Sequence, residues 1–319
     1  MKVFLLYLVL LIGVLVVCYL ASDKTDHAKE VTAPEKTEGL KQEPQIIAQG
    51  TIVSETKTVK KPAANKVAEV KKVVIPEPQT PPAPRLEDKP PAENKGYYST
   101  ALSLKGEELK VALHQLIRRH RVLTYGELWD ALSELDSAGQ GKVMLIYRRI
   151  PRAADLNGGD QDDWNREHLW PRAYGISRSS PANTDLHHIR ASDVKTNADR
   201  GHLYFDETEG DTSPGINFSS DQDSWEPPRE VKGDIARAMF YMAVRYEGIE
   251  PNERDFELSD TPDISTQTLG KLSVLLEWHM ADPVSDEEKV RNEKIFRSYQ
   301  GNRNPFIDHP EFAQRVFTQ

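Results

Sequence analysis

The stretch Trp164–Phe205 contains three closely spaced motifs, which read WNREHLWPR (164–172), DLHHIR (185–190) and NADRGH (197–202). Together they hold four histidines, a glutamate next to one of them, an asparagine and several arginines. Carboxylate and amide oxygens suit a hard divalent cation, imidazole is a general base near neutral pH, and guanidinium groups contact phosphate. The combination favours a site where a metal ion and an imidazole act on a phosphodiester.

The spacing of these motifs predicts a strand, a second strand and a helix. Residues 166–170 are apolar enough for a short strand that stops at Pro171. Residues 185–190 are its expected partner, and residues 192–200 are expected to form a helix with Ser192 as N-cap. The sequence therefore predicts a ββα arrangement with a histidine on the first strand and an asparagine on the helix.

The rest of residues 96–319 predicts a mainly helical α+β domain. Helices are expected where apolar residues recur at helical spacing, and Ser285 followed by Glu288 forms a capping box. Trp164, Trp170, Trp225 and Trp278 are expected in the core. The expected helices are 106–120, 125–135, 231–246, 268–280 and 285–299; a strand is expected at 143–147 and loops at 150–163 and 206–224.

Four separated blocks resemble the bacterial endonuclease I family. They are WNREHLWPR, DLHHIRASDVKTNADRGHLYF, WEPPREVKGDIARAMFYMAVRY and GNRNPFIDHPEF, in the family's order, and the resemblance covers residues from about 100 to 318. It implies a helical α+β fold with an embedded ββα-metal (His-Me finger) motif. It also implies an enzyme that hydrolyses DNA, with RNA as an open alternative, and that has little sequence preference. We expect a monomer whose products carry a 5′-phosphate.

The resemblance also assigns roles to individual residues. His168 matches the family's general base, which takes a proton from the attacking water. Glu167 and Asn197 match the oxygen ligands of one divalent metal, expected to be Mg²⁺, with Mn²⁺ or Ca²⁺ as alternatives. The family also uses an arginine to stabilise the phosphate in the transition state, and Arg178 is the first candidate, with Arg172 next.

Further arginines are expected to contact the nucleic acid, and several alternatives stay open. Arg172, Arg190 and Arg200 are the predicted nucleic-acid contacts.

Residues 199–202 spell DRGH, the signature of another ββα-metal nuclease family, in which His202 would be the base and Asn217 a metal ligand. Different functions remain too: a non-catalytic nucleic-acid- or surface-binding module, or a zinc hydrolase that uses the histidines. His187 and His188 are adjacent, so one is expected to face the site while the other has a structural role.

The N-terminal part predicts attachment to a membrane. Residues 3–21 form an unbroken apolar run of nineteen residues that includes Cys18, close to the ~20 that a spanning helix needs. Residues 22–95 are rich in Pro, Lys and Glu, which predicts a disordered linker. We expect residues 1–21 to anchor the chain, with residues 96–319 on the periplasmic side of a bacterial inner membrane. The alternative is a cleaved signal and a secreted or periplasmic protein.

The charge distribution limits the mode of nucleic-acid binding. Residues 97–319 carry 27 Lys and Arg against 38 Asp and Glu, a net charge of −11. Affinity for a phosphate backbone normally comes from Lys and Arg, so the body as a whole is unsuited to tight binding. Residues 164–205 nevertheless carry a net charge of +2. A locally positive site on an acidic body favours an enzyme that releases its product.

Overall fold

The structure, a computed structural model, describes residues 96–209, 217–250 and 253–318. The predicted anchor at residues 1–21 and the predicted linker at 22–95 lie outside these described residues. Within them, no helix combines the length and the apolar character needed to cross a bilayer.

The described chain is a mixture of helices and small sheets, which confirms the predicted α+β class. The strands form three sheets, with the orders β1-β2-β3, β4-β5 and β6-β8-β7. The strands are β1 (Ser137–Gly139), β2 (Lys142–Met144), β3 (Pro151–Ala153), β4 (Trp164–His168), β5 (Ile189–Asp193), β6 (Tyr204–Phe205), β7 (Ser219–Ser220) and β8 (Ser224–Glu226). The helices are α2 (Gly106–Ile117), α3 (Leu128–Leu135), α4 (Val194–Arg200), α5 (Lys232–Arg245), α6 (Leu272–Ala281), α7 (Asp286–Lys294), α8 (Pro305–Asp308) and α9 (Phe312–Phe317).

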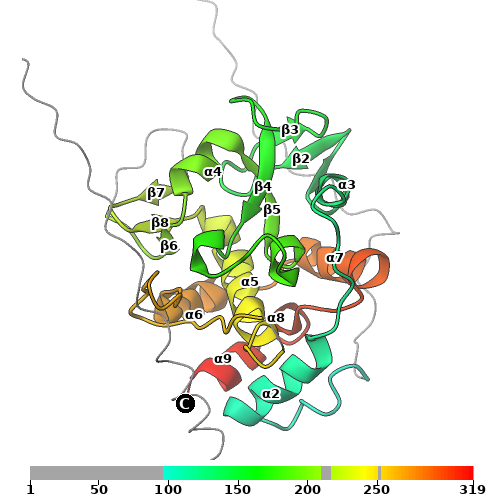
Figure 1. The fold of residues 1–319 in the computed structure, drawn as a ribbon, viewed down its shortest axis with the longest axis vertical. Helices are drawn as coiled ribbons and strands as arrows, with labels where there is room; N and C mark the ends of the chain where they lie inside the picture. The colour runs from blue at the N-terminus through cyan, green and yellow to red at the C-terminus, as the bar shows by residue number, and fades with distance from the viewer. Residues whose placement is uncertain (1–95, 210–216, 251–252, 319) are drawn as a thin grey trace, which may run out of the picture. The chain divides into compact units, whose positions relative to one another are not determined.

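Helix α5 runs through the middle of this body (Figure 1), with α6 and α7 on either side of it in the view. Ile235, Met239 and Met242 are fully buried, as the predicted core face requires. The helix is buried on almost every side, because all of its residues from Ile235 to Arg245 lie in the interior. Burial of each large apolar side chain contributes about 1.5–3 kcal/mol, so the apolar residues of α5 contribute substantially to the stability of the body.

A second, smaller core lies beneath the β4–β5 hairpin. Trp164 on β4 is fully buried, and its ring meets the ring of Trp129 on α3 edge to face, with 5.1 Å between centroids. Leu128 and Leu132 of α3 and Ile189 of β5 belong to the same apolar cluster. This packing fixes the hairpin to α3, and so it fixes the strand that carries Glu167 and His168.

Both strands of the hairpin begin and end at residues other than those predicted. The two strands pair antiparallel, with Trp164 opposite Asp193 and His168 opposite Ile189. The second strand begins at Ile189 instead of Asp185, because Asp185 turns the chain: its carboxylate accepts the backbone N–H of His187 at 3.0 Å. The predicted N-cap of α4, Ser192, is wrong. Asp193 caps the helix instead, and its Oδ1 accepts the Thr196 N–H at 3.0 Å.

Other predicted elements are confirmed with shorter bounds. The predicted helices 106–120, 125–135, 231–246 and 268–280 correspond to α2, α3, α5 and α6. The predicted helix 285–299 becomes α7 followed by a π-helical turn over Ile295–Tyr299, and the capping box of Ser285 and Glu288 is present. The predicted loops contain the short strands β3 and β7, and β8 begins at Ser224, the last residue of the second predicted loop. These strands lack alternating apolar residues, so their sequences gave no periodic signal.

Candidate active site

The β4–β5 hairpin and α4 form a ββα unit in consecutive order along the chain. Glu167 and Asn165 alternate with His168 and Arg166 along β4, so the two pairs leave the strand on opposite faces. Helix α4 contacts both strands, and its Asn197 and Arg200 bond to Asn165 and Glu167. The unit therefore places the predicted metal ligands between strand and helix, with His168 at the end of the strand.

One open pocket collects most of the predicted site residues. Its volume is about 430 Å³, and its lining is more polar than apolar. It is lined by Tyr125, Gly158, Asn165, Arg166, Glu167, His168, Pro171, Arg172, Ala173, Asn197, Gly201 and His202. The structure thus brings Glu167, His168 and Asn197 into one pocket, although they are up to thirty residues apart in the sequence.

Glu167 is buried and held by two neighbours on one oxygen. Its Oε1 accepts the hydroxyl of Tyr147 at 2.6 Å and Nη1 of Arg200 at 2.9 Å. Burial raises the pKa of Glu167, while the charge of Arg200 and the Tyr147 hydroxyl oppose that rise. The positive charge of Arg200 offsets part of the cost of burying the carboxylate, which is several kcal/mol for an uncompensated buried charge. Glu167 is therefore rigidly placed at the pocket wall.

Asn197 is oriented by a side chain on the facing strand. Its Nδ2 donates to Oδ1 of Asn165 at 2.6 Å. Because the amide nitrogen is the donor in this bond, Oδ1 is the atom of Asn197 that remains to act as a ligand or acceptor. Asn165 was not singled out from the sequence. Its position two residues before Glu167 on a strand is the signal that places it on the same face.

His168 is 6% exposed. Its Nε2 lies 3.1 Å from the backbone carbonyl oxygen of Asn183, which only accepts hydrogen bonds, so this contact favours a proton on Nε2. A second backbone hydrogen bond, to Arg166, also acts on the ring and, like the one to Asn183, raises its pKa. Burial, together with the nearby His188 and Arg172, lowers the pKa of His168 to about 3. The imidazole is thus neutral at physiological pH, the state that a general base requires.

The two adjacent histidines, His187 and His188, are both buried and lie outside the pocket lining. His188 Nε2 bonds to the Ala182 carbonyl at 2.7 Å, and its ring lies 5.5 Å from the ring of His168. His187 Nε2 bonds to the Asn302 carbonyl at 3.2 Å. They are not on a strand, because β5 begins at Ile189. His188 therefore packs against His168, whereas His187 packs against Tyr241, and the carbonyl bonds of both hold the turn that leads into β5.

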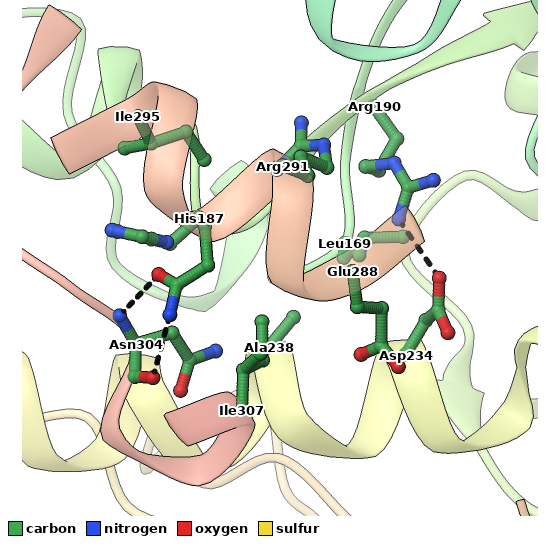
Figure 2. A pocket seen from close by; sticks show the side chains of 11 residues that line it. Leu169, His187, Arg190, Asp234, Ala238, Glu288, Arg291, Ile295, Asn304 and Ile307 are labelled. Atoms are coloured by element: carbon green, nitrogen blue, oxygen red, sulfur yellow. Dashed lines mark hydrogen bonds and ion pairs between the residues drawn. The ribbon is translucent and has the colours of Figure 1, made fainter. Parts of the chain in front are cut away.

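The arginines fall into two groups. Arg200 is fully buried and binds Glu167 and the carbonyls of His168 and Leu169. Arg190 binds Asp136 at 3.0 Å and Asp234 at 3.3 Å, and Figure 2 shows the second pair beside a small internal cavity of about 20 Å³. Both side chains are directed into the protein and paired there, which differs from the expected contacts with a nucleic acid.

Arg172 and Arg178 remain at the surface. Both are exposed, but only Arg172 lines the pocket. Arg178 lies on the segment after the pocket, and its backbone carbonyl accepts the Nδ2 of Asn183 at 3.3 Å. Among the described residues, Arg172 is therefore better placed than Arg178 to reach a phosphate held near His168.

The alternative base, His202, also lines the pocket, and it is exposed. Its proposed companion Asn217 is exposed too, but it is not part of the pocket lining. The arginine of the DRGH stretch, Arg200, binds Glu167, which ties this stretch to the other candidate site. Glu167 and Asn197, the metal ligands of the first candidate site, therefore line the pocket, whereas Asn217, the ligand of the alternative site, does not.

A separate group of acidic side chains lies away from this pocket. Oxygens of Glu247, Asp255 and Glu257 lie within 4.8 Å of one another. The ammonium group of Lys110 contacts Glu247 and lies 3.4 Å from Glu257, so a cation already offsets their charge. Burial raises the pKa of Glu247 to about 7. We regard this group as part of the packing between α2 and the chain after α5.

Comparison with known proteins agrees with this geometry. The family model described as endonuclease I matches residues 105–311, which contain the whole ββα unit. The chain belongs to the endonuclease I family. This nuclease is 47% identical over 234 residues to the extracellular ribonucleases of Bacillus amyloliquefaciens and Bacillus subtilis (strain 168). In each case the alignment covers 72% of this chain and 80% of the relative.

Proposed function

We propose that this chain is an extracytoplasmic, metal-dependent endonuclease that hydrolyses phosphodiester bonds with little sequence preference. The observation that supports this most directly is the shared pocket of Glu167, His168 and Asn197. A carboxylate, a neutral imidazole and an amide oxygen are the groups that a one-metal hydrolysis needs. The two extracellular relatives support a location outside the cytoplasm.

His168 is the proposed general base. Its Nε2–H is held by the Asn183 carbonyl, so Nδ1 takes the proton from the attacking water. The resulting imidazolium is stabilised by the same carbonyl, which accepts more strongly from a cation. His188 packs against the ring and restricts its rotation. The Asn183 carbonyl supports this tautomer, and the packing of His188 supports this orientation of the ring.

Glu167 and Asn197 are the proposed holders of the metal. Their chemistry fits a hard cation, because Asn197 has its amide oxygen free of the Asn165 bond and Glu167 accepts both side-chain hydrogen bonds, from Tyr147 and Arg200, on Oε1. Mg²⁺ is the first choice, and Mn²⁺ or Ca²⁺ would suit the same oxygens. When bound, the cation would supply neutralising charge to the phosphate and the leaving oxygen.

Arg172 is the better-supported candidate for the arginine that stabilises the charged phosphate, and Arg178 is the weaker one. Arg172 lines the pocket, and no carboxylate pairs with it among the described residues. An unpaired guanidinium at a pocket wall is free to bind two phosphate oxygens. Arg178 would have to move into the pocket to do the same.

The proposed chemistry is open to both DNA and RNA. Water is the proposed nucleophile, so the reaction needs no 2′-hydroxyl. The expected 5′-phosphate products would result if water attacks phosphorus, the P–O3′ bond breaks and the 3′-oxygen leaves. The name of the two relatives, ribonuclease, makes RNA the first substrate to test. An enzyme that used the 2′-hydroxyl of RNA would instead leave DNA intact and require no metal.

A digestion assay tests the proposal. The full chain is incubated with RNA and with DNA, each with Mg²⁺ and each with EDTA, and the product ends are typed. We expect cleavage in Mg²⁺, loss of cleavage in EDTA and 5′-phosphate ends. Cleavage of RNA alone that persists in EDTA would contradict the proposed mechanism, and absence of any cleavage would favour a binding module.

A further inference from the structure

Arg166, which the sequence did not single out, is held rigidly at the pocket wall. Its guanidinium carbon lies 3.7 Å from the ring centroid of Tyr125 and 3.7 Å from that of Trp129, so it is placed between two aromatic faces. Its Nη1 donates to the Tyr125 carbonyl at 2.7 Å. A guanidinium stacked and bonded in this way has lost most of its rotational freedom before any ligand arrives.

The charge of Arg166 has no carboxylate partner among the described residues. This separates it from Arg190 and Arg200, which both form ion pairs inside the protein. Arg172 lines the same pocket as Arg166. Two guanidinium groups that line one pocket repel each other, and an anion bound between them would relieve that repulsion.

The position of Arg166 relative to His168 suggests which anion this is. The two residues are two apart on β4 and leave the strand on the same face. Their Cα atoms are therefore roughly 7 Å apart, a spacing similar to that of successive phosphates on a nucleic-acid strand. His168 acts at the scissile phosphate, so Arg166 lies where the neighbouring phosphate would pass.

We propose that Arg166 binds the phosphate next to the one that is cleaved, with Tyr125 and Trp129 as positioning residues. This inference rests on the proposed function. It gives the enzyme a reason to prefer polynucleotides over isolated phosphodiesters, because a substrate without a flanking phosphate forgoes this contact. Because Arg166 lines the pocket, its positive charge is available to a phosphate bound there, although residues 97–319 as a whole carry a net negative charge.

The test uses three dinucleotides, each with one cleavable phosphodiester: one without a terminal phosphate, one with a 5′-phosphate and one with a 3′-phosphate. The full chain with Mg²⁺ should cleave one of the two phosphorylated dinucleotides at least about tenfold more efficiently than the bare one, mainly through a lower KM. Arg166→Met should abolish this preference, because it should lower cleavage of the favoured phosphorylated dinucleotide by more than cleavage of the bare one.

Two further variants separate binding from folding. Met fills the space between the two rings, so Arg166→Met should keep the fold, which thermal unfolding checks. Arg166→Lys keeps the charge without the planar fork and should retain part of the preference. Arg254→Met removes an exposed arginine outside the pocket and should keep all of it.

Several results would overturn the inference. These are equal cleavage of the three dinucleotides by the wild type, a preference that persists in Arg166→Met, and an equal loss on all three substrates in that variant. The proposed function is judged separately, by cleavage of polymeric RNA or DNA in Mg²⁺. If no nucleic acid is cleaved at all, the proposed function fails and this inference fails with it.

Discussion

Arg200 Nη1 lies 2.9 Å from Oε1 of Glu167, and both side chains are buried. The same guanidinium binds the carbonyls of His168 and Leu169, so Arg200 joins α4 to the end of β4 at the point where the proposed base sits. Breaking a buried pair on one side typically costs 3–5 kcal/mol. Arg200 is therefore a structural element of the site, and variants at Glu167 must be interpreted with stability measurements beside them.

The first prediction concerns the base. His168→Ala should lower kcat on RNA or DNA by about 10²–10⁴-fold, because the attacking water loses its proton acceptor. The far-ultraviolet circular dichroism and the thermal unfolding curve of the variant should show a folded protein. His202→Ala should have a much smaller effect, and an inactive His202→Ala beside an active His168→Ala would transfer the role to His202.

The second prediction concerns the metal ligands. Asn197→Ala should raise the Mg²⁺ concentration that gives half-maximal activity, because a hard cation with few protein ligands loses an oxygen donor. Glu167→Gln should do the same and should also lower stability through the lost charge opposite Arg200. Metal titrations followed by initial rates measure both, and wild-type titration curves in the two variants would refute the ligand assignment.

The third prediction separates the two candidate arginines. Arg172→Met should reduce kcat by at least about tenfold, because Arg172 lines the pocket and can bind the charged phosphate. Arg178→Met should change kcat by much less, because its side chain is not among the lining residues. The matched pair removes the same charge in both variants. A larger loss in Arg178→Met would show that its segment moves into the site on substrate binding.

The fourth prediction concerns stability in acid. Burial lowers the pKa of His187 and of His188 to about 4, against about 6.5 in an unfolded chain. Between these values the unfolded state binds more protons, so stability is fully present above pH 6.5 and is lost as pH falls towards 4. Each histidine accounts for about 3 kcal/mol of this loss.

Urea unfolding at pH 7.5 and at pH 4.5 measures the acid effect. His187→Gln should show a smaller difference between the two pH values than the wild type, although it also loses the bond to Asn302. His202→Gln, at an exposed position, should show the wild-type difference. Equal pH dependence in His187→Gln and the wild type would mean that this histidine is not held neutral in the folded protein.

The fifth prediction concerns location. Residues 3–21 are apolar and long enough to span a bilayer, so the full chain should enter the membrane fraction. Protease added to spheroplasts should then release an active body that begins near residue 96. A soluble form that starts near Ser22 would indicate a cleaved signal, and protection from external protease would exclude a body outside the cytoplasm.

The sequence by itself determined the class of the fold and the identity of the candidate site. Apolar residues at helical spacing predicted α5 and α6, because a helix in a small domain must bury one face. The adjacency of Glu167 and His168, followed by Asn197, predicted the ββα unit and its order. These features are local or nearly so, and the residues that define them are close together in the chain.

Only the tertiary structure decided what each polar side chain contacts. Arg166, Arg172, Arg190 and Arg200 all stand near the motif, yet two of them are paired with buried carboxylates and two line the pocket. The partners of Arg190, Asp136 and Asp234, come from distant segments, and nothing in a single sequence records which distant residues meet. Whether an arginine is free to bind phosphate depends on the charges that folding places around it, because a buried ion pair leaves no charge for a ligand.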